Sequence, residues 1–216
     1  MRHGIGLIVK VARPFEGSRW RHPFGSTARH LIRKAPCPVW ILREDAPAGP
    51  TKILVAVDLV TDDTTRLTLC DKLLQVGTTL AALGDASLRV AHAWELWAEF
   101  AGRAHPGVAS LPRAVQRAKL RARERVDAFV ERHRPALRAE DVYCIHGKPE
   151  AVLPELIVAE RVDLLVMGSI GRVGLGSSLL GERAEEILNR VECPVLVVKP
   201  DGFVSPLSDR VSDPKA

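Results

Sequence analysis

The glycine-rich segment from residue 168 to residue 181 holds the residues whose types and spacing point most clearly to chemistry. Gly168 and Gly171 are three apart, nine residues follow, and Gly181 closes the pattern, with Gly174 among the glycines and serines between them. Glycine lets a backbone turn sharply, as we expect at Gly168, and lets a ligand approach closely. The free amides of a helix N-terminus favour an anion. The pattern predicts a nucleotide-type anion site, although it lacks the GK[ST] of a Walker loop.

Asp58 is a second candidate, because it directly follows the apolar run of residues 52–57. A carboxylate at the end of a strand can contact a nucleotide, or it can merely cap the next turn. Asp62 and Asp63 precede two threonines, and this arrangement favours a helix N-cap over a metal site. Of these acids, only Asp58 is a candidate ligand contact.

The other polar and aromatic candidates are weaker. His146 follows a strand-like run, and we interpret it as a structural or solvated histidine rather than a cleft residue. Trp94 and Trp97 are three apart, which allows an apolar lid, although packing in the core or in an interface is the better interpretation. The sequence shows no recognisable Ser-His-Asp or Cys-His arrangement and no HExxH pattern of metal ligands.

Strand-like and helix-like segments alternate along the chain, which predicts an α/β fold built from βαβ units. Five strands then form one doubly wound, parallel sheet, and a ligand binds beyond the carboxyl ends of the strands, where the strand order reverses. The expected strands cover residues 52–57, 88–93, 142–145, 163–168 and 194–198, and the expected helices cover residues 61–83, 113–134, 149–160 and 181–190.

The composition is that of an ordinary globular protein, with 216 residues of which 46% are hydrophobic and 26% are charged. The four cysteines are far apart, which favours reduced thiols over disulfides or a zinc ribbon. No apolar run is long enough for a transmembrane helix, and the first residues make a poor signal peptide. We therefore expect a cytoplasmic protein that does not contact a membrane.

The positive charge of the chain is concentrated near its beginning. Residues 1–45 hold nine Lys or Arg and three Asp or Glu, a net charge of +6, whereas the rest holds 31 − 9 = 22 basic and 26 − 3 = 23 acidic residues, a net charge of −1. Such a stretch can bind an anionic partner such as RNA or lipid headgroups. Because it lacks the interleaved aromatic residues that stack on bases, we interpret it as a solvated surface and do not expect nucleic acid as a partner.

An internal repeat is visible when residues 7–42 are laid on residues 163–198 without a gap. Both segments read as strand, loop, glycine, helix, Cys-Pro-Val and strand, at a constant offset of 181 − 25 = 156. The repeat favours a tandem protein whose first copy is present only as its last third. Ala12 and Phe15 fall at the places of the first two glycines, so we do not expect a nucleotide in that copy. The matching positions are Gly25 with Gly181, Ala28 with Ala184, and Cys37-Pro38-Val39 with Cys193-Pro194-Val195.

The GxxG–x9–G pattern, with VAVD ahead of it and CPVLVVKP behind it, resembles the universal stress protein family. The segments KPDGFVSP and Gly147-Lys148-Pro149 are most similar to the tandem-domain, E-type members. The resemblance implies a Rossmann-like, adenine nucleotide alpha hydrolase-like domain over residues 51–200. It also implies that residues 1–45 are the remnant of a first such domain and that residues 201–216 are a tail.

In the nucleotide-binding members, the ATP site uses the aspartate after the first strand, a residue after the second strand, and the three glycines. The resemblance therefore implies ATP as ligand, with Mg²⁺ if ATP is bound. This sequence departs from the pattern at Glu182, which replaces a Ser or Thr and whose carboxylate would repel a phosphate. Arg172 and Arg183 would supply compensating charge. The implied contact residues are Asp58, Ala93 (or His92 beside it), Gly168, Gly171, Arg172, Gly174, Gly181 and Glu182.

The leading hypothesis is a regulatory or protective binding module of the stress response that is not a turnover enzyme. One alternative is a slow, Mg²⁺-dependent ATP hydrolase or phosphotransferase, in which Glu182 binds the metal or orients a water. The other alternative is a purely structural interaction protein. In that case Val39–Leu42 pairs antiparallel with Val195–Val198, either within the chain as a pseudo-dimer or across a homodimer.

Overall fold

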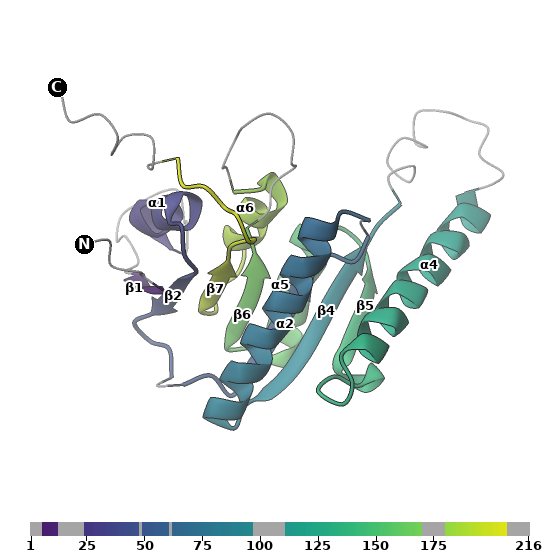
Figure 1. Cartoon of the computed structure of the whole chain (residues 1–216), viewed down its shortest axis with the longest axis horizontal. Helices are drawn as coiled ribbons and strands as arrows, with labels where there is room; N and C mark the ends of the chain where they lie inside the picture. The colour runs from purple at the N-terminus through teal and green to yellow at the C-terminus, as the bar shows by residue number, and fades with distance from the viewer. Residues whose placement is uncertain are drawn as a thin grey trace.

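A seven-stranded β-sheet runs through the protein in the computed structural model (Figure 1). The structure describes residues 6–12, 24–47, 49–60, 62–96, 111–169 and 180–206. The strands lie side by side in the order β1-β2-β7-β6-β3-β4-β5. Their bounds are Ile8–Ala12 for β1, Val39–Arg43 for β2, Lys52–Val57 for β3, Ser87–Trp94 for β4, Val142–His146 for β5, Leu164–Gly168 for β6 and Val195–Val198 for β7.

The five strands β7, β6, β3, β4 and β5 are parallel to one another, as the alternation of strands and helices predicts. A purely parallel, five-stranded sheet is nevertheless the wrong description of the sheet as a whole. β2 joins β7 antiparallel and β1 extends β2 in parallel, so the sheet is mixed. The pairing satisfies backbone N–H and C=O groups of β7 that an open edge would leave unpaired.

Helices cover both faces of this sheet. α2 and α4 lie in front of it in Figure 1 and pack on side chains such as Val55 and Val166, whereas α1, α5 and α6 pack on the face that carries Leu54 and Leu165. Successive residues of a strand point to opposite faces, so each buried strand serves both cores. Within the described ranges, no helix has the length and apolarity needed to cross a membrane. The helix bounds are Gly25–Lys34 for α1, Thr64–Gly84 for α2, Leu111–Arg132 for α4, Ala139–Asp141 for the 3₁₀ helix η2, Pro149–Glu160 for α5 and Glu182–Leu188 for α6.

Both ends of α2 follow from local chemistry. Asp63 precedes the first turn, and its Oδ1 accepts a hydrogen bond from the Thr65 amide at 2.9 Å, which confirms the predicted N-cap. The helix therefore begins after Asp63 and not at Thr61. At the other end, Asp85 adopts a left-handed conformation with φ 51°, and its N–H donates to the carbonyl of Ala81.

The N-terminal segment is attached to the rest of the chain by more than the β2–β7 ladder. The Lys199 ammonium, which is buried, donates to the carbonyl of Ile32 in the last turn of α1. The hydroxyl of Ser205 donates to the carbonyl of Lys34 at 2.6 Å. Glu185 of α6 forms ion pairs with Arg29 and Arg33 of α1. The segment is thus held by strand pairing, by a capped helix end and by charge.

The sheet ladders contradict the gap-free alignment of the repeat in its first strand. Val39 pairs with Ile8, whereas Val195, which the alignment matches to Val39, pairs with Leu165. The ladders therefore give an offset of 165 − 8 = 157 for this strand instead of 156. A slip of one residue moves every side chain of a strand to the other face of the sheet, so the buried face decides the true match.

This slip changes which residue corresponds to the first glycine of the motif. On the ladders, Val11 stands where Gly168 stands, and Ala12 is not its counterpart. Val11 is exposed together with Leu7 and Val9, on the face that α2 covers further along the sheet. A valine at this position would prevent a helix from packing as closely as α2 does on β6.

Candidate functional site

The carboxyl ends of β3 and β4 bring Asp58 and Ala93 to the same level. Val57, the last residue of β3, pairs with His92 of β4, so the residues that follow them come side by side. Asp58 lies just beyond β3 with its side chain 52% exposed, and Ala93 is half-buried between β3 and β5. The acid is therefore accessible at the edge where the sequence analysis expects it.

The end of β6 reaches the same edge on the other side of β3. Val55 pairs with Val166, and counting on along both parallel strands brings Asp58 level with Ser169. The chain passes from β3 to β4 on one side and later enters β6 on the other, so the strand order reverses between β3 and β6. Doubly wound proteins bind their ligands at such a reversal.

The carboxylate of Asp58 is held by its own turn and by one cation. Its Oδ1 accepts a hydrogen bond from the Val60 amide at 3.2 Å, and its Oδ2 lies 3.4 Å from Nη1 of Arg66. An ionised carboxylate has about four acceptor positions, so capacity remains on the exposed side for a hydroxyl of a ligand. Capping the turn and contacting a ligand are compatible roles for Asp58.

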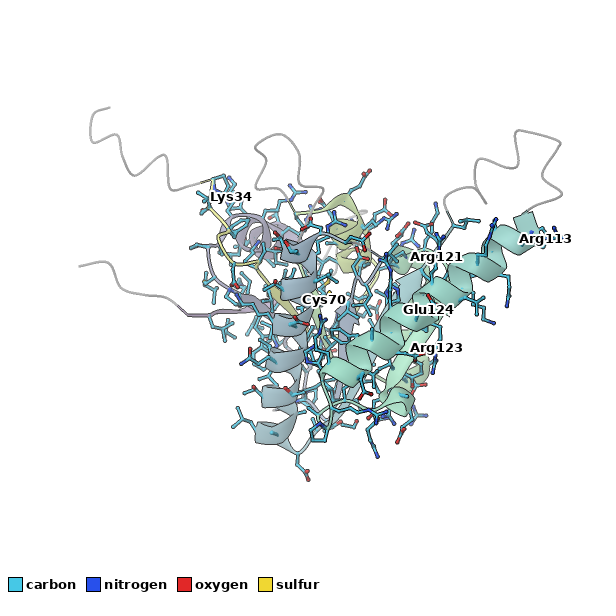
Figure 2. All side chains as sticks on the ribbon, turned by 45° about the vertical axis from the view of Figure 1, so that its right-hand side comes forward. Lys34, Cys70, Arg113, Arg121, Arg123 and Glu124 are labelled. Carbon is cyan, nitrogen blue, oxygen red and sulfur yellow. The ribbon has the colours of Figure 1, made fainter. Side chains whose placement is uncertain are left out.

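The loop after β3 is fixed by side chains from two helices. Arg125 of α4 donates from Nη1 to the carbonyl of Leu59 at 2.6 Å and from Nη2 to Asp62 at 3.1 Å. Cys70 of α2, labelled in Figure 2, donates from Sγ to the carbonyl of Asp58 at 3.5 Å. Burial raises the pKa of the Cys70 thiol to about 12, so the thiol keeps its proton. A loop that is already ordered loses little entropy when it binds a ligand.

His92, the alternative to Ala93 among the predicted contacts, supports this loop from the buried end of the site. The His92 ring is fully buried, with Nδ1 3.3 Å from the Val57 carbonyl and 3.4 Å from the Leu59 amide. Burial lowers the pKa of His92 below its ordinary value of 6.5, so the ring is neutral at pH 7. Its Nε2 finds no hydrogen-bond partner among the described residues. The signal in the sequence was a histidine within the apolar run of residues 90–94.

The glycine at the end of β6 permits close packing, a role that the sequence analysis did not expect. Gly168 does not have a positive φ. A Cβ at this position would lie 2.6 Å from Cδ2 of Leu69 and 3.7 Å from Cδ1 of Leu73. The missing side chain therefore lets α2 approach β6, and this close packing places the helix beside the site.

Ser169 and Gly181 bring the two ends of the glycine-rich segment together. The Gly181 amide donates to the carbonyl of Ser169 at 3.4 Å, and the Ser169 amide donates to the carbonyl of Val198 at 3.1 Å. Gly181 is the N-cap of α6, and Glu182 begins the helix with an exposed side chain. The predicted contacts Gly171, Arg172 and Gly174 lie outside the described residues.

An ion pair spans this edge of the sheet. Arg183, the second residue of α6, places Nη2 2.6 Å from Oε1 of Glu95, which directly follows β4. Arg183, one of the two arginines that we expected to compensate Glu182, is thus paired with a different carboxylate. The two partners are 88 residues apart, and no local sequence pattern connects them.

Aromatic packing explains the other candidates at this edge. The buried Trp94 stacks on His146, with 4.3 Å between ring centroids and 24° between the ring planes, in agreement with the structural interpretation of both residues. Trp97 lies outside the described residues. In the part of the chain that the structure describes, no group of three His, Cys, Asp or Glu residues is placed to hold a metal ion.

A parallel five-stranded core with helices on both faces, and with polar groups gathered where the strand order reverses, defines a doubly wound α/β domain. The Universal stress protein family matches residues 50–199 of this chain. The chain therefore belongs to the Universal stress protein family.

Individual relatives agree with this assignment. The chain is 30% identical over 194 residues to Universal stress protein E of Salmonella typhi, and the match covers 85% of this chain and 58% of that protein. It is 26% identical over 205 residues to Universal stress protein E of Escherichia coli (strain K12), with 94% and 64% covered. A crystal structure of a functionally unknown protein from Pseudomonas aeruginosa PAO1 matches with a TM-score of 0.75 and 26% identity, over 96% of this chain and 67% of that one. The chain thus spans less than two thirds of the length of these two named relatives.

Proposed function

We propose that this chain is a regulatory module of the stress response whose state depends on an adenine nucleotide bound at the carboxyl edge of β3, β4 and β6. The observation that carries the proposal is the common level of Asp58, Ala93 and Ser169 at the point where the strand order reverses. Membership of the Universal stress protein family supports the stress-response part. Output through occupancy, rather than through turnover, is part of the proposal.

The residues at this edge suit the nucleoside end of such a ligand. The exposed oxygens of Asp58 can accept hydrogen bonds from ribose hydroxyls, and the loop that carries Asp58 is already fixed by Arg125 and Cys70. The hydrogen bond between Gly181 and Ser169 holds the ends of the glycine-rich segment beside this acid. A triphosphate would bring strong negative charge to the same edge when it binds.

Glu182 opposes the phosphate end, and its exposure limits the penalty. Two like charges about 4 Å apart repel by roughly 1 kcal/mol in water, against roughly 4 kcal/mol at an effective dielectric constant near 20. Since the Glu182 side chain is exposed, the water value applies. We expect the carboxylate to weaken ATP binding about fivefold without abolishing it. Carboxylate oxygens are also ligands that Mg²⁺ accepts, which would reduce the conflict further.

Isothermal titration calorimetry with ATP and Mg²⁺ tests the proposal on the full chain. We expect micromolar binding by the wild type and about fivefold tighter binding by Glu182→Ser. Asp58→Ala should bind about 10 to 150 times more weakly, because a hydrogen bond to a charged group contributes about 1.5–3 kcal/mol. Asp127→Ala removes an equally exposed carboxylate from the outer face of α4 and should bind like the wild type.

Three results would overturn or redirect this proposal. If neither the wild type nor Glu182→Ser binds ATP, an adenine nucleotide is not the ligand of this edge. Equal weakening by Asp58→Ala and Asp127→Ala would show that charge alone, and not the site, governs binding. Phosphate release by the wild type above that of a Gly181→Val control would favour the ATP hydrolase over a binding module.

A further inference from the structure

The first half of α4 is a strongly basic surface. It carries Arg113, Arg117, Lys119 and Arg121, and the first acidic residue of the helix is Glu124. All four cationic side chains are exposed. We call these four residues the basic half of α4.

This part of the helix contributes no buried side chain to the core. The buried side chains of α4 begin at Ala122 and continue with Val126, Phe129 and Val130, whereas residues 112–121 include none that is buried. Figure 1 shows this end of α4 leaning away from β5, and Figure 2 shows Arg113 at its far end. The basic half is therefore presented outward and is not required for the core.

The ion pairs of α4 change character along its length. Among the residues that the structure describes, no carboxylate is paired with any cation of the basic half. From residue 123 onward, by contrast, the arginines of the helix have acidic partners. These pairs are Arg123 with Asp127, Arg125 with Asp62, and Arg132 with Asp71.

The placement of these cations is unfavourable for an isolated helix. Arg113, Arg117 and Arg121 are four apart, so they lie along one line and repel each other. The helix has no acidic residue in its first turn, and cations at a helix N-terminus oppose the helix dipole. Both effects are relieved by an anion that lies along the line. Three arginines spaced in this way extend over about 12 Å of helix, a length of duplex that carries about seven phosphate charges.

We propose that the basic half of α4 binds the phosphate backbone of a nucleic-acid duplex without reading its sequence. Charge complementarity favours this partner, because one projecting helix carries four cations and no described carboxylate is paired with them. Contacts to the backbone need cations only, whereas single strands are held largely by stacking on aromatic side chains. Residues 113–121 contain no aromatic residue, which disfavours a single strand and does not count against a duplex.

A lipid surface fits the same helix less well. A helix that lies on a membrane combines its basic face with a broad apolar face that enters the lipid. In α4 the buried apolar side chains pack on the sheet, and Leu120 is the large apolar side chain that is exposed among residues 112–121. One leucine offers little area for insertion.

Fluorescence anisotropy with a labelled 20-base-pair duplex at several salt concentrations tests the proposal. Each neutralised phosphate contributes about −0.9 to the slope of log K against log salt. Four contacts give a slope of about −3.6, so the affinity should fall about 150-fold between 50 and 200 mM NaCl. The triple variant Arg113→Gln, Arg117→Gln, Arg121→Gln should bind weakly, with a slope near −0.9. Glutamine has a helix propensity close to that of arginine, so the helix should stay folded.

A matched control neutralises three exposed arginines at the opposite, amino-terminal edge of the sheet, with the changes Arg134→Gln, Arg138→Gln and Arg161→Gln. This control should bind the duplex like the wild type. The proposal is overturned if the wild type does not bind duplex at 50 mM NaCl, or if both triple variants bind equally. Binding to phosphatidylserine vesicles, or to a single strand, in the absence of duplex binding would also overturn it. Thermal melting of all three proteins separates misfolding from lost contacts.

Discussion

Replacing Gly77 by alanine tests how closely α2 is packed on the sheet that positions the site. Gly77 lies in the interior of α2, where alanine is the better helix former. A Cβ at this position, however, would lie 2.5 Å from Cγ2 of Val55 and 3.1 Å from Cδ1 of Leu88. Val55 is fully buried in the central strand β3, and its branched side chain has little freedom to rotate away.

The expected magnitude follows from two opposing effects. Glycine to alanine in a helix interior stabilises by about 1 kcal/mol, and forcing an extra methyl group into a packed core costs about 1–3 kcal/mol. We therefore expect Gly77→Ala to leave stability unchanged or to lower it by as much as about 2 kcal/mol. Gly84→Ala is the matched control, because Gly84 ends the same helix and a Cβ there would meet the Pro50 carbonyl oxygen at an ordinary 3.5 Å. This control should stabilise by about 0.5–1 kcal/mol.

Urea denaturation and thermal melting of the two variants measure the difference directly. Both substitutions restrict the unfolded chain equally, so the difference between them reports contacts in the folded state. For a chain of this size, 1 kcal/mol corresponds to about 2–4 °C in Tm, and we expect Gly84→Ala to melt several degrees above Gly77→Ala. If Gly77→Ala proves as stable as Gly84→Ala, α2 does not pack on Val55 as closely as described, and the account of Gly168 and Leu69 fails with it.

Two further predictions concern pH. Burial lowers the pKa of His92 below the 6.5 of an unfolded chain, so the free energy of unfolding should decrease as the pH falls below about 6.5. Urea titrations at pH 7 and pH 5 should show a smaller decrease for His92→Gln than for the wild type. Burial lowers the pKa of Lys199 from 10.5 to about 8, so the ammonium loses its proton at a lower pH in the folded state than in the unfolded state. The free energy of unfolding should therefore rise as the pH increases from about 8 to 10.5. The rise, at most about 3 kcal/mol, should be absent in Lys199→Met. Burial raises the pKa of the Cys70 and Cys193 thiols to about 12, which lowers the free energy of unfolding above pH 9. This effect should be equal in the wild type and in Lys199→Met. Each prediction is contradicted if its variant shows the same pH dependence of stability as the wild type.

The predictions from sequence succeeded where the signal is local. The run that forms β3 and the segment that forms α5 have the predicted bounds, because apolar periodicity and a proline in the first turn are properties of neighbouring residues. α2 begins three residues later than the apolar spacing predicts, because the capping hydrogen bond of Asp63 decides its start. The start of α4 was expected at residue 113 and lies at Leu111.

The candidate site was predictable only in part. Asp58 could be located because it ends an apolar run, and that run predicts a buried strand. The reason for Gly168 could not be found, since a close approach of Leu69 from α2 and a sharp turn both select glycine. His92 was named only as an alternative ligand contact, and its supporting role depends on the loop after β3 that the fold brings next to it. Glu95 was not predicted, because its importance depends on α6, which the fold brings next to it.

By itself, the sequence determined the α/β class, the order of the elements, the residues that follow the strands, and the family. Each of these rests on periodicity, on turn chemistry or on a motif within a few tens of residues. Only the tertiary structure decided that the antiparallel pairing of β2 with β7 forms within the chain, that the ladder of β1 is displaced by one residue from the gap-free alignment, and that Arg183 is paired with Glu95. These features join residues that are far apart in the chain. Their free energies depend on which face of the sheet is buried and on which strand ends meet, so they can be predicted only when the order of the strands is known.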